Sequence, residues 1–147
     1  VRVTGPRTLT VEGPDAHGRK LFIGIPYESS YTFSTFAIRE GDSKGNAVTT
    51  GRLQLRRLTL NCSNTGFLHM HVTPKFRPTS TYTFTGRELG HGTNIIGAIP
   101  LYTGTINFPI LSLNTQVEVK VGSDSFLPFA LVNASWEGFY NTRNASV

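Results

Sequence analysis

Two histidines, His69 and His71, are the residues whose type and spacing most directly suggest chemistry. They are two positions apart in a stretch of alternating apolar residues, so on a β-strand both imidazoles point to one face. Two imidazoles can bind a metal ion, but a metal site needs a third and a fourth ligand. The remaining histidines are His17 and His91. We therefore predict a pair of exposed or interfacial histidines, with no metal and no cofactor.

Cys62 is the only cysteine, which excludes an internal disulfide. A thiol nucleophile needs a base and a group that orients the base, and no orienting group is identifiable. Cys62 continues the apolar positions Leu58 and Leu60, so we expect a small buried hydrophobe. The 9 acidic residues are scattered, and the nucleophile-elbow, phosphate-loop and dinucleotide-binding motifs are absent. The sequence therefore predicts a protein that is not an enzyme.

The chain is basic, with 14 lysines and arginines against 9 acidic residues and a formal net charge of +5. Such an excess suits a polyanionic partner or simply a soluble surface. The basic residues gather modestly at Arg19-Lys20 and at Arg52, Arg56 and Arg57, without the interleaved aromatic residues of a nucleic-acid groove. We expect the charge to serve solubility more than specific nucleic-acid binding. No apolar run approaches the ~20 residues of a membrane-spanning helix, so no membrane anchor is predicted.

The elements that position these residues are predicted to be β-strands. The 147 residues include 15 glycines and 8 prolines, and no window shows sustained helical spacing of apolar side chains. This composition suits many turns between short strands. We predict an all-β, antiparallel β-sandwich or barrel-like domain with about 8–10 short strands and negligible helix. Residues 1–20 are expected to form a lead-in arm or edge strand, residues 21–141 a single β domain, and residues 142–147 a flexible tail.

The stretch Gly51–Val72 is predicted to be a long two-stranded ribbon at the centre of the domain. Its leucines alternate with polar residues, but the phase slips by one at Arg56-Arg57. A slip that leaves the strand continuous needs an extra residue, so we predict a β-bulge at the arginine pair. The polar residues 61–66 are expected to form the turn, and residues 68–72 the second strand. The leucines predicted to be buried are Leu53, Leu55, Leu58 and Leu60.

Further strands are predicted where short apolar or alternating runs lie between glycine or proline breakers. A second phase slip near residues 34–35 indicates a bulge or a bend between two sheets, and Pro109 and Pro128 indicate edge strands. The glycine-rich stretch Gly86–Gly97 is predicted to be a mobile contact loop. The predicted strands are Thr8–Glu12, Leu21–Ile25, Tyr27–Ile38, Thr81–Thr85, Thr105–Leu111, Thr115–Val121, Phe126–Val132 and Ser135–Tyr140, with an exposed loop at Glu40–Thr50.

Several segments together resemble the C-terminal portion of tail tubular protein B, the nozzle protein family of short-tailed bacteriophages. The resemblance covers the chain from about Phe22 onward. Its motifs include a G-R-L-x-L-R-R strand at Gly51–Arg57 and a W-x-G-x-[YF] closing strand at Trp136–Tyr140. The segments that carry it, in order, are IGIPYESSYTFSTF (23–36), GRLQLRRLTLNCSNTGFLHMHV (51–72), FTGRELG (84–90), IPLYTGTINFPI (99–110) and SFLPFALVNASWEGFYNTR (125–143).

This resemblance implies a structural protein of the virion, assembled in the host cytoplasm as a hexameric ring beneath the portal and adaptor. It also implies transient, non-specific passage of DNA through the lumen and contacts with tail fibres. Proteins of this family are several times longer, so this chain, which begins at Val1, is expected to be a fragment. The candidate subunit-interface or DNA-channel residues are Arg52, Arg56, Arg57 and Arg87, and the candidate contact-loop residues are Gly90, His91 and Asn94.

The alternative function is a carbohydrate- or host-receptor-binding β-sandwich module of a tail fibre. It depends on exposed aromatic side chains, and Trp136 and Tyr140 are the candidates for such a glycan platform. Most of the aromatic residues are instead expected to fill the core of the sandwich. A small β-sandwich hydrolase is disfavoured because no catalytic constellation is identifiable.

Overall fold

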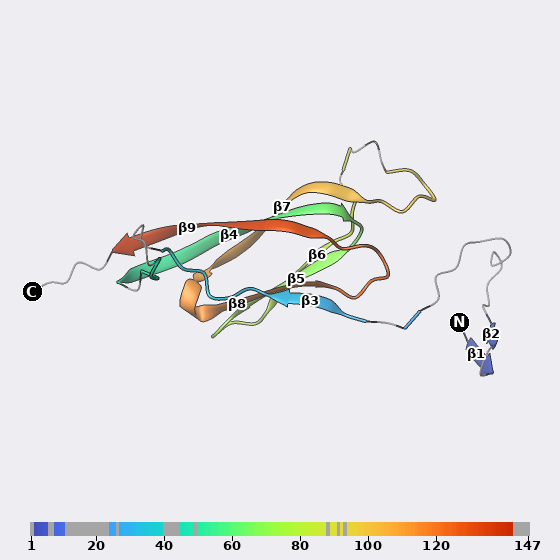
Figure 1. The fold of residues 1–147 in the computed structure, drawn as a ribbon, viewed down its shortest axis with the longest axis horizontal. Coiled ribbons are helices and arrows are strands. Elements are labelled where there is room, and N and C mark those ends of the chain that lie inside the picture. Colours follow the sequence, from blue (N-terminus) through green and yellow to red (C-terminus); the bar gives the residue numbers. More distant parts are fainter. Residues whose placement is uncertain are drawn as a thin grey trace, which may run out of the picture.

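The chain folds as two antiparallel β-sheets packed face to face, with a separate two-stranded sheet near the N-terminus (Figure 1). The computed structural model describes residues 2–5, 8–10, 24–25, 27–39, 45–48, 50–87, 89–90, 92 and 94–142. In the larger sheet the strand order is β3-β8-β5-β6, and in the smaller sheet it is β7-β4-β9. The predicted all-β, antiparallel, sandwich-like fold is confirmed. The elements are β1 (Arg2–Gly5), β2 (Thr8–Thr10), β3 (Ser29–Thr32), β4 (Gly51–Thr65), β5 (Leu68–Pro74), β6 (Ser80–Phe84), β7 (Tyr102–Leu113), η1 (Asn114–Gln116), β8 (Val117–Ser123) and β9 (Leu131–Thr142).

Strand β4 is the central strand of the smaller sheet and carries the predicted bulge. Its register shifts between Leu55 and Arg57 against both neighbours, β7 and β9. The extra residue returns the leucines to the same face, because a one-residue slip would otherwise turn them outward. All four predicted leucines are buried, at 5% exposure for Leu53 and 0% for Leu55, Leu58 and Leu60.

The predicted two-stranded ribbon is wrong, because β4 and β5 lie in different sheets and do not pair. The predicted turn at residues 61–66 is also wrong, since β4 continues to Thr65 and only Gly66 and Phe67 separate it from β5. Gly66 is buried at this crossing, where an added Cβ would lie 2.9 Å from the Cβ of Leu127. Apolar alternation identifies the buried face of each strand but not its hydrogen-bonding partner, which explains both errors.

Several other strands lie close to their predicted positions. Strands β6 and β8 correspond to the predicted Thr81–Thr85 and Thr115–Val121, and β7 is an edge strand that contains Pro109. The predicted strand Phe126–Val132 is wrong, since residues 124–130 are a connection and β9 begins at Leu131. That connection is tied to the end of β4, where the Gly66 amide donates to the Pro128 carbonyl at 2.9 Å.

The N-terminal half of the chain departs furthest from prediction. Within Tyr27–Ile38 only β3 is a strand, and Thr8–Glu12 yields a three-residue strand, β2, paired with the unpredicted β1. Two predicted segments lie partly outside the described residues. These are the strand Leu21–Ile25, at residues 21–23, and the loop Glu40–Thr50, at residues 40–44 and 49. Arg39, which precedes the predicted loop, forms an isolated antiparallel bridge with Ala47, which lies within it.

The core lies between the two sheets and is built mainly from aliphatic side chains of β4, β5, β7 and β8. Cys62 belongs to this core with 2% exposure, as predicted, and burial raises the pKa of its thiol. A thiol in that environment stays protonated and unreactive at neutral pH. Among the described residues, no helix has the length and hydropathy to cross a membrane. The buried hydrophobic residues are Leu53, Leu55, Leu58, Leu60, Cys62, Leu68, Met70, Val72, Phe108, Ile110, Val119 and Val121.

Candidate assembly surfaces

The outer face of the smaller sheet carries an arginine cluster around the bulge of β4. Arg57 lies opposite Glu137 of β9, and its Nε donates to Glu137 Oε2 at 2.8 Å while its Nη2 lies 2.6 Å from the same oxygen. Arg56 Nη1 is 3.7 Å from Glu137 Oε1, and the Arg56 guanidinium lies 5.9 Å from the ring centre of Phe139. Arg52 is exposed on the same strand. The structure therefore brings three of the predicted arginines onto β4 and gives two of them an acidic partner on the neighbouring strand.

Beyond the bulge, the same outer face becomes a neutral ladder of amide and hydroxyl side chains. The Asn61 amide donates to Asn133 Oδ1 at 2.7 Å, and the Thr105 hydroxyl donates to Asn61 Oδ1 at 2.6 Å. Thr59 donates to Asn107 Oδ1 at 2.7 Å on the adjacent rung. These side chains hydrogen-bond to one another across β9, β4 and β7, so the surface is polar and uncharged. Sequence reasoning missed this ladder because strand pairing is needed to bring its members together.

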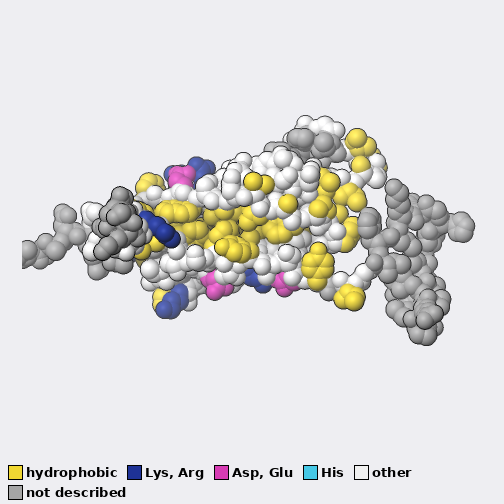
Figure 2. Space-filling model, viewed as in Figure 1, with side chains coloured by type: hydrophobic (Ala, Val, Ile, Leu, Met, Phe, Trp, Pro, Cys, Tyr) yellow, Lys and Arg dark blue, Asp and Glu magenta, His cyan; other side chains and the backbone are white. Residues whose placement is uncertain are grey.

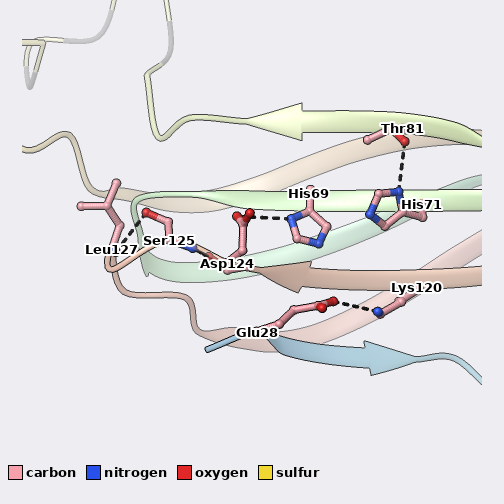
Figure 3. Close-up of polar contacts among 9 residues, drawn as sticks. Glu28, His69, His71, Thr81, Lys120, Asp124, Ser125 and Leu127 are labelled. Carbon is pink, nitrogen blue, oxygen red and sulfur yellow. Dashed lines mark hydrogen bonds and ion pairs between the residues drawn. The ribbon is translucent and has the colours of Figure 1, made fainter. Parts of the chain in front are cut away.

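The outer face of the larger sheet holds the two histidines (Figure 3). His69 and His71 lie side by side on β5, with ring centres 4.8 Å apart. His71 Nδ1 is 3.0 Å from the Thr81 hydroxyl, and His69 Nδ1 is 3.9 Å from Asp124 Oδ1. Among the described residues, no group of three or more His, Cys, Asp or Glu side chains has the geometry to hold a metal ion. His17 lies outside the described residues.

An ion pair between Glu28 and Lys120 lies next to the histidines. Lys120 Nζ donates to Glu28 Oε1 at 2.7 Å (Figure 3). Lys120 lowers the pKa of Glu28, first through the hydrogen bond and then through its charge, and His69 and His71 add to this effect. The Glu28 side chain is 52% exposed and that of Lys120 34%, so the pair contributes little to stability.

Trp136 and Tyr140 project inward from β9 and pack against the core. Trp136 is paired in register with the buried Leu58, and its ring centre lies 6.2 Å from that of Phe36. The Tyr140 hydroxyl donates to the Thr50 carbonyl at 2.9 Å. Both side chains are partly buried and contribute to the core, and a role for them in binding a glycan stays a prediction.

The loop between β6 and β7 contains the remaining candidate residues, which are Arg87, Gly90, His91 and Asn94. Arg87, Gly90 and Asn94 are exposed, and His91 lies outside the described residues. The loop and the start of β4 lie at opposite ends of the sandwich (Figure 1), so Arg87 does not join the β4 arginines. The described part of this loop also exposes apolar side chains that sequence reasoning did not single out, namely Leu89, Ile95, Ile96 and Ile99.

The fold is an all-β sandwich of two antiparallel sheets, whose surfaces carry an arginine cluster, a neutral polar ladder and exposed apolar side chains. The family model of the bacteriophage nozzle protein matches residues 2–147. The chain belongs to the bacteriophage nozzle protein family, whose members are structural components of the phage tail and therefore of the virion. The resemblance is confirmed, and the match begins earlier than the expected Phe22. Because the family is structural, the prediction that the chain is not an enzyme is also confirmed.

The chain is also similar to the tail tubular protein gp12 of Escherichia phage T7. The two are 33% identical over 132 residues, which cover 88% of this chain and 16% of the phage T7 protein. The chain therefore spans about a sixth of the length of the relative that it matches.

Proposed function

We propose that this sandwich is part of the wall of a tail nozzle through which phage DNA leaves the particle. In this proposal the full-length protein forms a hexameric ring that contacts the adaptor and the tail fibres. The observation that carries the proposal is the match of nearly the whole chain to the nozzle family. Stiff sheets and a buried aliphatic core suit a load-bearing wall, because packed interiors deform little.

The arginine cluster on β4 is proposed to lie at the boundary between subunits of the ring. Arg57 is already paired with Glu137, and the two side chains remain 50% and 47% exposed. A partly exposed charge pair of this kind can be shared with a neighbouring subunit, and ion pairs at a rim fix the register of an interface. A DNA-facing role is less suitable, because each neutralised phosphate adds affinity and would slow the passage of DNA.

The neutral ladder beyond the bulge is the better candidate for a surface past which DNA moves. Its amides and hydroxyls are already hydrogen-bonded to one another, as in the pair Asn61 and Asn133 at 2.7 Å. Such groups present neither cations that hold phosphates nor carboxylates that repel them. The exposed loop between β6 and β7 is proposed to contact another tail protein through its apolar side chains.

The test is to replace Arg56 and Arg57 by Ala in the full-length protein and to count rings by electron microscopy. Loss of rings with unchanged weak retention of duplex DNA supports the boundary role. Intact rings with altered DNA ejection would refute it. Lys75→Ala is the matched control, because Lys75 is an exposed cation in the turn between β5 and β6.

A further inference from the structure

On one side of the sandwich, between β9 and β3, the described residues include no strand that joins the two sheets. Strand β9 is 12 residues long and pairs with β4 along one edge, while its other edge meets no other described strand. The opposite edge strand, β7, is protected against further pairing by Pro109 and by Leu111, whose φ is +50°. Strand β9 has no proline and no lysine, and its one charged residue, Glu137, is held by Arg57. An edge this long and this unprotected readily accepts another strand.

The inner face of β3 carries a side chain that the described residues leave exposed. Tyr31 is paired in register with Val121, and paired residues of adjacent strands point to the same face. Val121 is fully buried, so Tyr31 also points toward the interior, yet Tyr31 is 56% exposed. At the opposite side of the sandwich, Phe108 and Ile110 on the inner face of β7 are only 5% and 4% exposed. The smaller sheet therefore covers β6 and β5, but no strand within the described part of the chain faces β3.

Aromatic side chains form the floor of this side of the sandwich. The ring centres of Tyr31 and Phe33 are 5.1 Å apart, and those of Phe33 and Phe36 are 5.8 Å apart. Phe36 in turn lies 6.2 Å from Trp136 of β9. Figure 2 shows hydrophobic side chains gathered in a band along this side, between the part of the surface formed by β9 and the part formed by β3. An apolar band beside a free strand edge is the surface that an added β-strand covers.

We infer that an extended segment of the nozzle polypeptide, from outside these 147 residues, pairs with the free edge of β9 and covers Tyr31. Main-chain hydrogen bonds to β9 would hold it, and every second side chain would pack on the aromatic floor. The segment is therefore expected to be apolar at alternate positions. The segment needs no charged residue to pair with β9, because Glu137, the one charged residue of β9, already has arginine partners.

The source of the segment is the nozzle chain itself. This chain covers 16% of the phage T7 relative, so most of that relative's sequence lies outside the matched region. A segment tethered to the same polypeptide has a high effective concentration at the edge, which favours it over a separate molecule. The inference concerns the fold of the nozzle chain and holds whether or not the protein forms a ring.

Residue-resolved hydrogen–deuterium exchange on the full-length protein tests this inference, in the dilute monomeric state and after assembly. A strand bonded on one edge protects alternate amides, whereas a strand bonded on both edges protects consecutive ones. We expect consecutive protected amides along β9 in both states, as on the central strand β4. Alternating protection of β9 in both states would overturn the inference. Protection that appears only after assembly would assign the segment to a second copy and would equally overturn it.

A matched pair of variants adds a second readout in the same full-length protein. Tyr31→Lys places a charge on the aromatic floor, whereas Phe76→Lys places it on a side chain that is 79% exposed in the turn between β5 and β6. We expect Tyr31→Lys to speed exchange at alternate β9 amides by about tenfold or more, and Phe76→Lys to leave them unchanged. Continued protection of β4 shows that both variants are folded. Equal exchange of β9 in the two variants would contradict the inference.

Discussion

Arg57 and Glu137 face each other across β4 and β9 at the point where the bulge interrupts the register, with Nη2 and Oε2 2.6 Å apart. The bulge serves two purposes there. It keeps the leucines on both sides of it buried, and it places Arg56 and Arg57 together around one carboxylate. The surface chemistry of this face thus follows from the same extra residue that maintains the core.

Replacing Glu137 by Gln leaves two arginines without their acidic partner. The pair is about half exposed, so we expect the free energy of unfolding to change by less than about 1 kcal/mol. In the unassembled protein, where no neighbouring subunit covers these arginines, retention of duplex DNA should instead increase and become more sensitive to salt, because more cations are free to contact phosphates. Glu118→Gln, an equal charge change at an exposed position on the other sheet, is the control. Equal DNA retention by the two variants would contradict this expectation.

Leu58→Ala tests the role of β4 as the central strand. Leu58 is fully buried, so the substitution removes packing and leaves a cavity, and we expect a loss of about 2–5 kcal/mol in the free energy of unfolding. Denaturant titration measures it. The same change at the fully exposed Leu89 should have almost no effect, and a comparable loss there would show that burial is not the cause.

Gly86→Ala tests how the loop between β6 and β7 packs against the crossing at Gly66. Gly86 has φ +69°, and an added Cβ would lie 2.6 Å from the Pro100 carbonyl oxygen. Both the positive φ and the clash oppose a side chain, so we expect a destabilisation of at least about 1 kcal/mol, seen as a lower Tm. An added Cβ at Gly92, in the same loop, meets nothing within 4 Å. Gly92→Ala should therefore leave Tm unchanged, and a neutral Gly86→Ala would be evidence against this backbone geometry.

The pKa of Glu28 should depend on Lys120. Lys120 lowers this pKa in the folded protein, so Lys120→Met should raise it toward its ordinary value, which an NMR titration of the Glu28 carboxyl measures. A lowered pKa means that ionised Glu28 stabilises the fold above its unfolded-state pKa of about 4.3, and that this contribution disappears as the pH falls through the folded-state pKa. An unchanged titration in Lys120→Met would show that the ion pair does not form in solution.

The sequence was most informative where one strand's own pattern decides the outcome. The bulge at Arg56-Arg57 and the buried Cys62 could both be predicted, because alternation of apolar residues records which face is buried. The pairing of β4 and β5 could not, since alternation carries no information about partners, and the two-residue crossing at Gly66 resembles a hairpin turn.

The surfaces were less predictable for the same reason. The ladder through Asn61, the contact of Arg57 with Glu137 and the side of the sandwich at Tyr31 each combine residues that are far apart in the sequence. Strand order alone brings them together. The exposed Ile95 and Ile96 were visible in the sequence, because apolar residues within a glycine-rich loop are a signal for a contact surface.

We propose that this sandwich forms part of the wall of a nozzle ring that conducts DNA. Electron microscopy of the assembled full-length protein, with the sandwich located by its two sheets, tests this claim most directly. We expect a six-fold ring in which the sandwich lies in the wall, with the Arg56-Arg57 bulge of β4 at the boundary between neighbouring subunits. A ring of different symmetry, or a sandwich that projects from the outside of the ring without contacting the next subunit, would contradict it.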